Sequence, residues 1–269
     1  MDFRGKVAIV TGSTRGIGLA TARMLAAGGA HVAISSRKAD ACQGVADKLN
    51  EEGLSALAIP AHAARDEDLA RLVGATIDRF GSLDIVVGNV AINPVFDPLA
   101  DVAEDSWAKV LDTNVSGPLR LARHAYAYLS RPGGAFVLVS SVNAHFGFVG
   151  SGAYGISKAA VEQMVRQLAV EWGPEGLRVN AVCPGTTDTD MIRELADRPG
   201  FAELTARSTP LGRIAQPEDI AGSICFLASA KSRHVTGQVL VVDGGQSIMR
   251  GQYGPDVKRI RDTSPNSKE

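Results

Sequence analysis

Short runs of apolar residues alternate along the chain with longer stretches in which apolar residues recur at helical spacing. Such runs are typical of strands buried on both faces of a parallel sheet, and the longer stretches predict helices between them. The predicted strands lie near residues 6–11, 31–35, 55–60, 84–88, 134–140, 177–183 and 238–242, and the predicted helices near 17–28, 39–52, 66–80, 104–130, 153–172 and 217–229. This alternation predicts an α/β fold with a doubly wound parallel sheet of about seven strands and helices on both faces.

The alternating pattern continues to about residue 250, which predicts a single domain over residues 1–250. The chain has 269 residues, 45% of them hydrophobic, which is enough for a core of its own. Residues from about 188 to 212 include a short helical pattern that predicts a mobile lid over a ligand site, although a plain surface helix would look the same. Residues 251–269 form a polar tail that predicts a flexible terminus, or a segment whose first half packs on a neighbouring subunit.

Charge and composition exclude several classes of partner. The net charge is −1, with 28 basic and 29 acidic residues evenly mixed, so nothing favours nucleic acid or an anionic membrane. The chain has neither a long apolar run nor a cleavable signal pattern, so we expect a soluble, cytoplasmic protein. Cys42, Cys183 and Cys225 lie far apart, which favours reduced thiols, and the five histidines show no metal spacing, so we expect no metal.

A glycine-rich turn joins the first predicted strand to the first predicted helix. Its residues are Thr11, Gly12, Ser13, Thr14, Arg15, Gly16, Ile17 and Gly18. The N–H groups and the dipole of a helix N-terminus favour a pyrophosphate at such a turn. The spacing G-x-x-x-G-x-G departs from the common G-x-G-x-x-G, so the turn alone fits either nucleotide binding or a structural tight turn.

Tyr154 and Lys158 lie four residues apart in the predicted helix 153–172 and project from the same helix face. An ammonium near a phenol favours the phenolate, so Lys158 can tune Tyr154 as a general acid or base, although an isolated pair can also be two ordinary surface residues. Ser141 follows a predicted buried strand, at the end that faces the ligand crevice. Asn114 is a polar residue on an apolar helix face and needs a partner.

In this order, T-G-x-x-x-G-x-G, Asn114, Ser141, Tyr154 and Lys158 resemble the short-chain dehydrogenase/reductase family, a group of Rossmann-fold oxidoreductases, over about residues 3–250. The segment around Asn89 resembles the family's N-N-A-G motif, which lines the adenosine side, but departs from it at Gly88, Val90 and Ala91. Pro184 and Gly185 follow a strand as they do in the family. The next loop looks like the one that holds the nicotinamide carboxamide, here with Thr187 and Thr189.

The residues after the second predicted strand favour NADP(H) over NAD(H). A site for NAD usually places a carboxylate there, whereas this chain has Ser36, Arg37 and Lys38, and Arg15 in the glycine turn adds another cation for a 2′-phosphate. His62, followed by Ala63, stands where many family members have the aspartate that meets the adenine. The predicted cofactor-binding residues are Gly12, Ser13, Thr14, Arg15, Gly16, Ile17, Gly18, Ser36, Arg37, Lys38, His62, Ala63, Asn89, Tyr154, Lys158, Pro184, Gly185, Thr187 and Thr189.

The resemblance implies hydride transfer between nicotinamide and a carbonyl carbon, with Tyr154 as proton donor. It also implies that Ser141 binds the substrate oxygen, that Lys158 lowers the tyrosine pKa and grips the ribose, and that Asn114 holds a water linked to Lys158. We expect reduction of a ketone or aldehyde, most like the NADPH-dependent carbonyl reductases. The predicted substrate-contacting residues in a mostly apolar pocket are Ile92, Ser141, Asn143, His145, Phe148, Tyr154 and Met191.

Three alternatives stay open. A 3-oxoacyl carrier-protein reductase would need a basic rim, to which Arg131 could contribute but Glu175 could not. An alcohol dehydrogenase would run the same chemistry in the oxidative direction. A non-catalytic NADP-binding sensor would keep the fold but would not need Asn114, Ser141, Tyr154 and Lys158. The family resemblance further implies a homotetramer, or a dimer, in which the long predicted helices pair across a symmetry axis.

Overall fold

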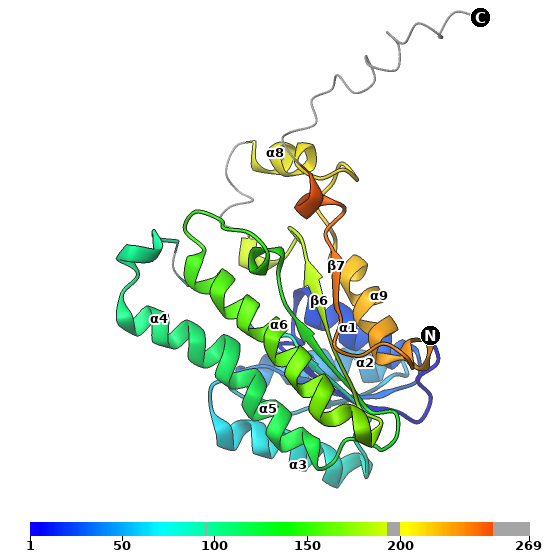
Figure 1. The fold of residues 1–269 in the computed structure, drawn as a ribbon. Helices are drawn as coiled ribbons and strands as arrows, with labels where there is room; N and C mark the ends of the chain where they lie inside the picture. The colour runs from blue at the N-terminus through cyan, green and yellow to red at the C-terminus, as the bar shows by residue number, and fades with distance from the viewer. Residues whose placement is uncertain (95, 193–199, 250–269) are drawn as a thin grey trace, which may run out of the picture.

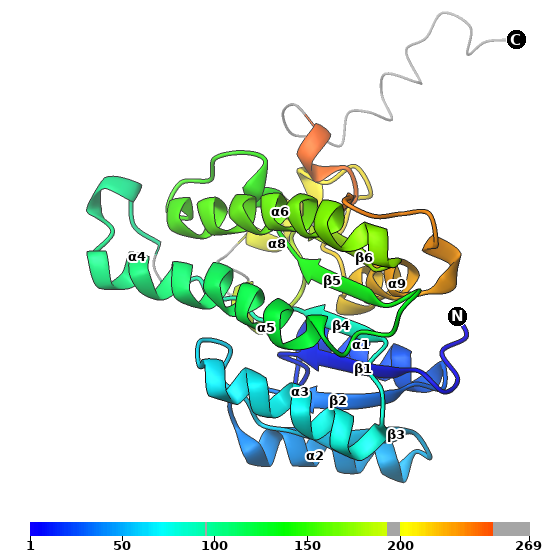
Figure 2. The same ribbon diagram turned by 60° about the horizontal axis from the view of Figure 1, so that its bottom comes forward.

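The computed structural model describes residues 1–94, 96–192 and 200–249. Within these residues, strands form one parallel sheet in the order β3-β2-β1-β4-β5-β6-β7; Figure 1 labels β6 and β7, and Figure 2 labels β1 to β6. The strands are β1 (Val7–Thr11), β2 (His31–Ser35), β3 (Ser55–Ala58), β4 (Ile85–Gly88), β5 (Ala135–Val139), β6 (Arg178–Pro184) and β7 (Val239–Val242). The prediction of a doubly wound parallel α/β sheet is confirmed.

Helices cover both faces of the sheet (Figures 1 and 2). They are α1 (Gly16–Ala27), α2 (Ala39–Glu51), α3 (Asp66–Phe80), α4 (Glu104–Leu111), α5 (Gly117–Tyr126), α6 (Gly152–Trp172), α8 (Phe201–Arg207) and α9 (Pro217–Ala228). One core cluster packs α3, α5 and α6 against the sheet through Leu69, Leu121 and Val161. A second packs α1, α2 and α9 through Leu25, Leu49 and others. The sheet is therefore buried on both sides, as its continuous apolar strands require.

The predicted helix 104–130 differs from the observed structure. Helical structure ends at Tyr126, and a π-helical segment, Asp112–Ser116, separates α4 from α5. Beyond Tyr126 the chain turns, and Leu129 forms a bridge with Leu83 beside the sheet, so residues 127–130 cannot continue the helix. A π-helical segment inside an α-helix commonly marks a functional position, and this one contains Asn114.

The strand order places the candidate site. The chain leaves β1 toward β2 and β3, then returns to β4 on the other side of β1, so the order reverses between β1 and β4. In open parallel sheets, ligands bind at the carboxyl ends of the strands beside such a reversal. The glycine turn, Asn89, Ser141 and Gly185 follow β1, β4, β5 and β6, respectively, and gather at this edge.

Two predicted segments are only partly described. In the predicted lid, 188–212, the structure shows a 3₁₀ turn at Asp190–Ile192 and the short helix α8, while residues 193–199 lie outside the described residues. The predicted tail, 251–269, also lies outside them. In the described part of the chain, no helix is long and apolar enough to cross a membrane.

Candidate active site

The backbone of the glycine turn encloses a concave space, called the cradle below, which side chains at the glycine positions would fill. Gly12 and Gly16 adopt positive φ angles of 65° and 53°. A Cβ at Gly18 would lie 2.2 Å from the carbonyl oxygen of Gly12, so only glycine fits there. Helix α1 begins at Gly16 with no side-chain cap and no acidic residue in its first turn, so its N-terminal N–H groups suit a phosphate. The turn therefore fits the pyrophosphate of a dinucleotide.

Two predicted cofactor residues brace this turn from inside. The Asn89 amide donates to the carbonyl oxygens of Thr11 and Gly12 at 3.0 and 3.3 Å. The buried Ser13 hydroxyl donates to the Val10 carbonyl at 2.7 Å and accepts from the Ser35 N–H at 2.9 Å, which ties β1 to β2. Both side chains are thus engaged with the protein, where they shape the turn.

Cations lie beside the turn where a 2′-phosphate is predicted. Arg37 and Lys38 follow β2 and are exposed. Arg15, on the turn itself, is exposed and forms an ion pair with Asp190 at the start of the predicted lid. Asp190 therefore competes with any anion for the Arg15 guanidinium, while Arg37 and Lys38 stay available at the end of β2.

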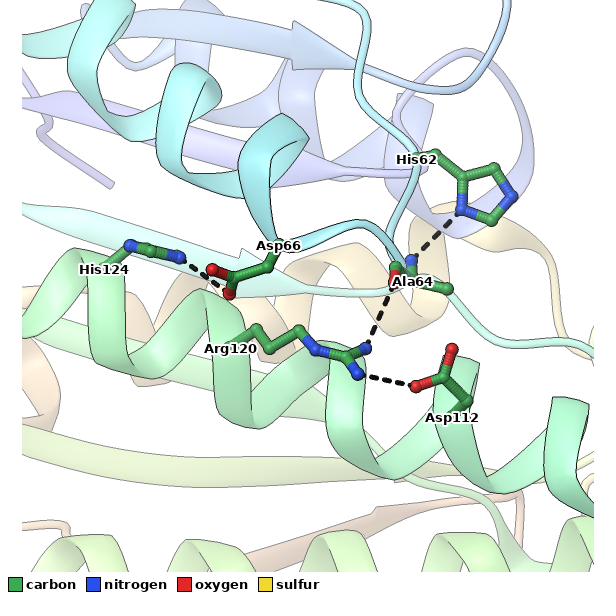
Figure 3. Close-up of polar contacts among 6 residues, drawn as sticks. All are labelled: His62, Ala64, Asp66, Asp112, Arg120 and His124. Atoms are coloured by element: carbon green, nitrogen blue, oxygen red, sulfur yellow. Dashed lines mark hydrogen bonds and ion pairs between the residues drawn. The ribbon is translucent and has the colours of Figure 1, made fainter.

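The loop at His62 and Ala63 is fixed by a polar network that Figure 3 shows. The His62 imidazole accepts from the Ala64 N–H at 3.2 Å, and Arg120 of α5 donates to the Ala64 carbonyl at 3.2 Å. Arg120 also pairs with Asp112 of the π-helical segment at 2.7 Å. This network holds the predicted adenine-side loop against the helix that carries Asn114. Sequence analysis gave no signal for Arg120.

Close packing at Gly117 strengthens the same contact. A Cβ at Gly117 would lie 2.6 Å from the Ala63 carbonyl oxygen, so the first residue of α5 must be glycine for the loop to sit where it does. His124, two turns along the helix region, contacts Asp66 at the start of α3 at 2.9 Å. The loop therefore has a defined position before any ligand is considered.

Tyr154 and Lys158 lie together near the start of α6, both buried. The Lys158 ammonium is 5.6 Å from the centroid of the Tyr154 ring and donates to the Val139 carbonyl at the end of β5, at 2.6 Å. Burial lowers the pKa of Lys158 from 10.5 to about 8. Burial also raises the pKa of Tyr154 from 10 to about 12, partly opposed by a hydrogen bond with Ser141.

The expected lowering of the tyrosine pKa by Lys158 is therefore not seen in this structure. The physical reason is that desolvation of the phenolate outweighs the attraction of a cation at this distance. A tyrosine with a raised pKa stays protonated at neutral pH, which is the form that can give a proton away.

Ser141 connects the end of β5 to Tyr154. Its hydroxyl accepts from the Asn143 N–H at 3.3 Å and so caps a 3₁₀ turn, Val142–Ala144. Ser141 opposes part of the rise in the pKa of Tyr154, so the two side chains lie near each other. Asn143 lies against the next helix, because a Cβ at Gly155 would be 2.6 Å from the Asn143 carbonyl oxygen. The structure thus brings Ser141, Asn143 and Tyr154 together.

Asn114 is fully buried and clamps the strand-end loop to α6. Its Oδ1 accepts from the Ile92 N–H at 2.8 Å, and its Nδ2 donates to the Ile92 carbonyl at 2.9 Å and to the Ser157 hydroxyl at 3.0 Å. Ser157 in turn donates to the Tyr154 carbonyl at 2.6 Å. The amide is thus engaged with protein atoms, and the water link to Lys158 stays a prediction.

The loop after β6 lies across the glycine turn. The Thr187 hydroxyl donates to the Gly185 carbonyl at 3.0 Å, and Thr187 itself is buried. Thr189 approaches the turn so closely that a Cβ at Gly16 would be 3.2 Å from its methyl carbon. The loop at Pro184 and Gly185 therefore sits beside the cradle, as the prediction of a nicotinamide-side loop requires.

The remaining predicted substrate-contacting residues differ in their exposure and in their contacts. Phe148 and Met191 are exposed, at 54% and 45%, which suits the mouth of a pocket. Ile92 is held by Asn114, as described above. His145 contacts Glu162 at 3.0 Å, so its ring is fixed against α6.

Glu162 is a residue that sequence reasoning missed. It is buried in α6, where its carboxylate accepts from the Ser140 hydroxyl at 2.8 Å and contacts His145. The Cys183 thiol joins this group, and burial together with Glu162 raises the pKa of Cys183 to about 12. Donor atoms of His145, Glu162 and Cys183 lie within 4.8 Å of one another, close enough to hold a metal ion. The sequence does contain one signal for Glu162: Tyr154, Lys158 and Glu162 are spaced four residues apart, which places them on one face of the helix.

Comparisons with known proteins agree with this geometry. A family model described as Enoyl-(Acyl carrier protein) reductase matches residues 12–247. Dehydrogenase/reductase SDR family member 4 of Sus scrofa is 39% identical over 244 residues, covering 90% of this chain and 88% of that protein. Dehydrogenase/reductase SDR family member 2, mitochondrial, of Homo sapiens is 38% identical over 239 residues, covering 89% and 85%.

Two solved structures have the same fold. A short chain dehydrogenase from Burkholderia cenocepacia J2315 in complex with NADP is 34% identical, with a TM-score of 0.85, and the match covers 91% of this chain and 99% of that one. A short-chain type dehydrogenase/reductase from Mycobacterium ulcerans is 32% identical, with a TM-score of 0.89, and the match covers 98% and 96%.

Proposed function

Because this chain belongs to the short-chain dehydrogenase/reductase family of nicotinamide-dependent oxidoreductases, we propose that it uses NADP(H) to reduce a ketone or aldehyde to an alcohol, with Tyr154 as proton donor. The observation that carries the proposal is the grouping of Ser141 with the buried Tyr154 and Lys158. Ser141 interacts with the tyrosine, and the Lys158 ammonium lies 5.6 Å from the centroid of its ring.

The protonation states favour reduction. Burial raises the pKa of Tyr154 to about 12, so its phenol carries a proton at neutral pH and can donate it to a developing alkoxide. Ser141 holds the substrate oxygen beside that phenol. Lys158, whose pKa is lowered to about 8, is still charged at neutral pH and stabilises negative charge on the oxygen that loses the proton. The nicotinamide, when bound, supplies the hydride for the carbonyl carbon.

The cofactor choice rests on the cations at the end of β2. Arg37 and Lys38 are exposed there, and Arg15 lies on the adjoining turn. Arg binds a phosphate through two hydrogen bonds, whereas a site for NAD needs a carboxylate in this place. The Burkholderia cenocepacia relative was crystallised in complex with NADP. These points support NADP(H).

The proposed substrate class rests on exposed apolar side chains in the segments that we expect to line the pocket. Phe96, Phe146 and Phe148 are exposed at 44%, 38% and 54%, and Met191 at 45%. Apolar side chains in these segments favour lipophilic ketones over sugars or short polar acids. We extend the proposal to a homotetramer, or a dimer, in the cytoplasm, which size-exclusion chromatography and cell fractionation would test.

A reductase for 3-oxoacyl groups on a carrier protein is the second candidate, because the matching family model is described as a reductase of another acyl group, enoyl, on the same kind of carrier. An acidic carrier protein needs a basic rim. Arg131, the cation predicted for that rim, pairs with Glu175 at 2.5 Å and stacks on Tyr126, so its charge is largely neutralised. The local charge therefore favours a small ketone.

The deciding experiment is oxidation of NADPH and NADH against ketones, aldehydes, diketones and 3-oxoacyl thioesters. The controls are Tyr154→Phe, which removes only the donor hydroxyl, and Tyr128→Phe on the exposed surface. We expect NADPH-dependent turnover that falls by about 10²- to 10⁴-fold in Tyr154→Phe and is unchanged in Tyr128→Phe. Tight NADPH binding without turnover on any substrate would instead support the non-catalytic sensor, and turnover only in the alcohol direction would support a dehydrogenase.

A further inference from the structure

The structure buries a carboxylate next to the candidate active site that the proposed mechanism does not use. Glu162 lies one helical turn beyond Lys158 on α6 and is 4% exposed. Removing a carboxylate from water is costly unless hydrogen bonds compensate, so a buried glutamate calls for a reason.

The partners of Glu162 all come from elements around the site. The Ser140 hydroxyl, at the end of β5, donates to the carboxylate at 2.8 Å, and the His145 Nε2 lies 3.0 Å from it. The Cys183 thiol, on β6, lies within 4.8 Å of the carboxylate. Arg166, on the same helix, approaches to 3.7 Å. The carboxylate therefore joins β5, β6 and the loop after β5 to one point on α6.

Two of these partners bracket the catalytic serine. Ser140 directly precedes Ser141, and His145 follows the 3₁₀ turn that Ser141 caps. Glu162 thus holds both ends of the segment 140–145, which carries Ser141 and Asn143. The exposed Phe146 and Phe148 continue from its far end. The position of this segment decides where a substrate oxygen meets Ser141 and Tyr154.

We propose that Glu162 is a positioning residue: it anchors the segment 140–145 through Ser140 and His145, and thereby sets the position of Ser141 and of the aromatic side chains that follow. This inference rests on the proposed function. It extends that function by naming the group that aligns the substrate loop with the proton donor.

A metal ion in the same place is the competing explanation, because donors of His145, Glu162 and Cys183 lie within 4.8 Å of one another. Two observations favour the hydrogen-bonded anchor. The carboxylate already has hydrogen-bonding partners, and the cationic groups of Arg166 and Lys158 lie nearby, where they would repel a dication.

The test compares Glu162→Gln, which keeps the size of the side chain but removes its charge, with two matched variants of the same helix. Glu171→Gln makes the same change at an exposed position. Val165→Ala loosens the core of the helix at a fully buried position without touching the network. His145→Gln, at a partly exposed position, releases only one end of the segment. This variant replaces Glu162→Gln in the test if Glu162→Gln fails to fold. Hydrogen exchange of residues 141–149, NADPH affinity, and kcat and KM with the best ketone are measured for each.

We expect exchange in 141–149 to rise selectively in Glu162→Gln and His145→Gln, with kcat/KM lowered by about ten-fold or more because the reacting groups lose alignment. NADPH affinity should stay as in the wild type, and Val165→Ala should lower thermal stability without a selective change in this segment. Unchanged exchange and unchanged kinetics in Glu162→Gln would overturn the inference.

Adding Co²⁺ to the wild-type protein tests the competing explanation, a metal site at His145, Glu162 and Cys183. A thiolate-to-cobalt absorption band that disappears in Cys183→Ala would assign the cluster to metal binding and would also overturn the anchor. If the wild-type protein turns over no substrate, the proposed function fails, whereas the exchange measurement still decides whether Glu162 holds the segment.

Discussion

Asn114 grips the backbone of Ile92 with both ends of its amide, accepting from the N–H at 2.8 Å and donating to the carbonyl at 2.9 Å. Its third hydrogen bond, to Ser157, reaches the helix that carries Tyr154 and Lys158. The π-helical segment turns Asn114 inward toward these partners. A residue expected to hold a water linked to Lys158 therefore fixes the loop after β4 to α6.

Asn114→Ala should destabilise the protein by about 2–5 kcal/mol, because the half-buried N–H and carbonyl of Ile92 and the buried Ser157 hydroxyl lose their partner together. Asn50→Ala is the matched control. Asn50 makes the same pair of amide-to-backbone bonds with Ala56, but at an exposed position where water can replace them. Chemical denaturation of both variants measures the difference. An equal, small loss of stability in both would contradict the clamp.

The cations beside the glycine turn predict how cofactor preference changes. Arg37→Ala should weaken NADPH binding by about ten- to a hundred-fold, the worth of charge-assisted hydrogen bonds to phosphate, and leave NADH binding nearly unchanged. Asp190→Asn should tighten NADPH binding, because it removes the negative charge that pairs with Arg15. Titrations with both cofactors measure these effects. Equal losses for NADPH and NADH in Arg37→Ala would remove Arg37 from the phosphate site.

The pKa of Lys158 predicts a pH limit for reduction. Burial lowers this pKa from 10.5 to about 8, so the ammonium of the free protein loses its proton as the pH rises through about 8, while Tyr154, near 12, stays protonated. The kcat/KM for NADPH should therefore be level near neutral pH and fall above about 8. Lys158→Arg keeps its charge at these pH values and should lose that descending limb, whereas Lys48→Met, at an exposed position of α2, should keep it.

Titration of Lys158 does not itself lower the stability of the fold over this pH range. Between about pH 8 and 10.5 the unfolded chain binds the Lys158 proton and the folded chain does not, so this group makes folding more favourable as the pH rises. Thermal unfolding measured over the same range separates the two effects. A loss of activity that follows a loss of stability would contradict the assignment to Lys158.

Much of the fold could be predicted from the sequence because local patterns determine it. The apolar runs gave strands such as β2 at its observed bounds, and the order of Ser141, Tyr154 and Lys158 identified three groups that the structure brings together. A π-helical segment leaves no such pattern, since α- and π-helical turns differ by one residue of register. The predicted helix 104–130 was wrong in its continuity for this reason, and wrong in its end because Leu129 pairs with Leu83 beside the sheet.

Contacts between distant residues could not be predicted. Glu162 meets His145 and Cys183 only through the packing of α6 on the sheet, and Arg120 meets Ala64 only where α5 passes the loop before α3. The pKa of Tyr154 depends on desolvation, which requires knowing how deeply the ring is buried. The spacing of Tyr154 and Lys158 showed their proximity but not the direction of the shift.

The glycine turn offers a test in which shape alone changes. Gly18 and Gly44 both lie in helices, in α1 and α2, but a Cβ at Gly18 would be 2.2 Å from the Gly12 carbonyl oxygen and 2.7 Å from the Asn89 amide, whereas nothing lies within 4 Å at Gly44. Gly44→Ala should therefore stabilise the protein by about 0.5–1 kcal/mol, the ordinary gain of alanine over glycine in a helix.

Gly18→Ala should cost about 1–3 kcal/mol through overpacking, and it should weaken NADPH binding far more than that loss of stability implies. The reason is that the only way to relieve the contact is to move Gly12 away from the N-terminus of α1, which opens the cradle. Fluorescence titration with NADPH, at a temperature where both variants are folded, gives the measurement. If Gly18→Ala binds NADPH as tightly as Gly44→Ala does, then the glycine turn is a packing feature and the pyrophosphate binds elsewhere.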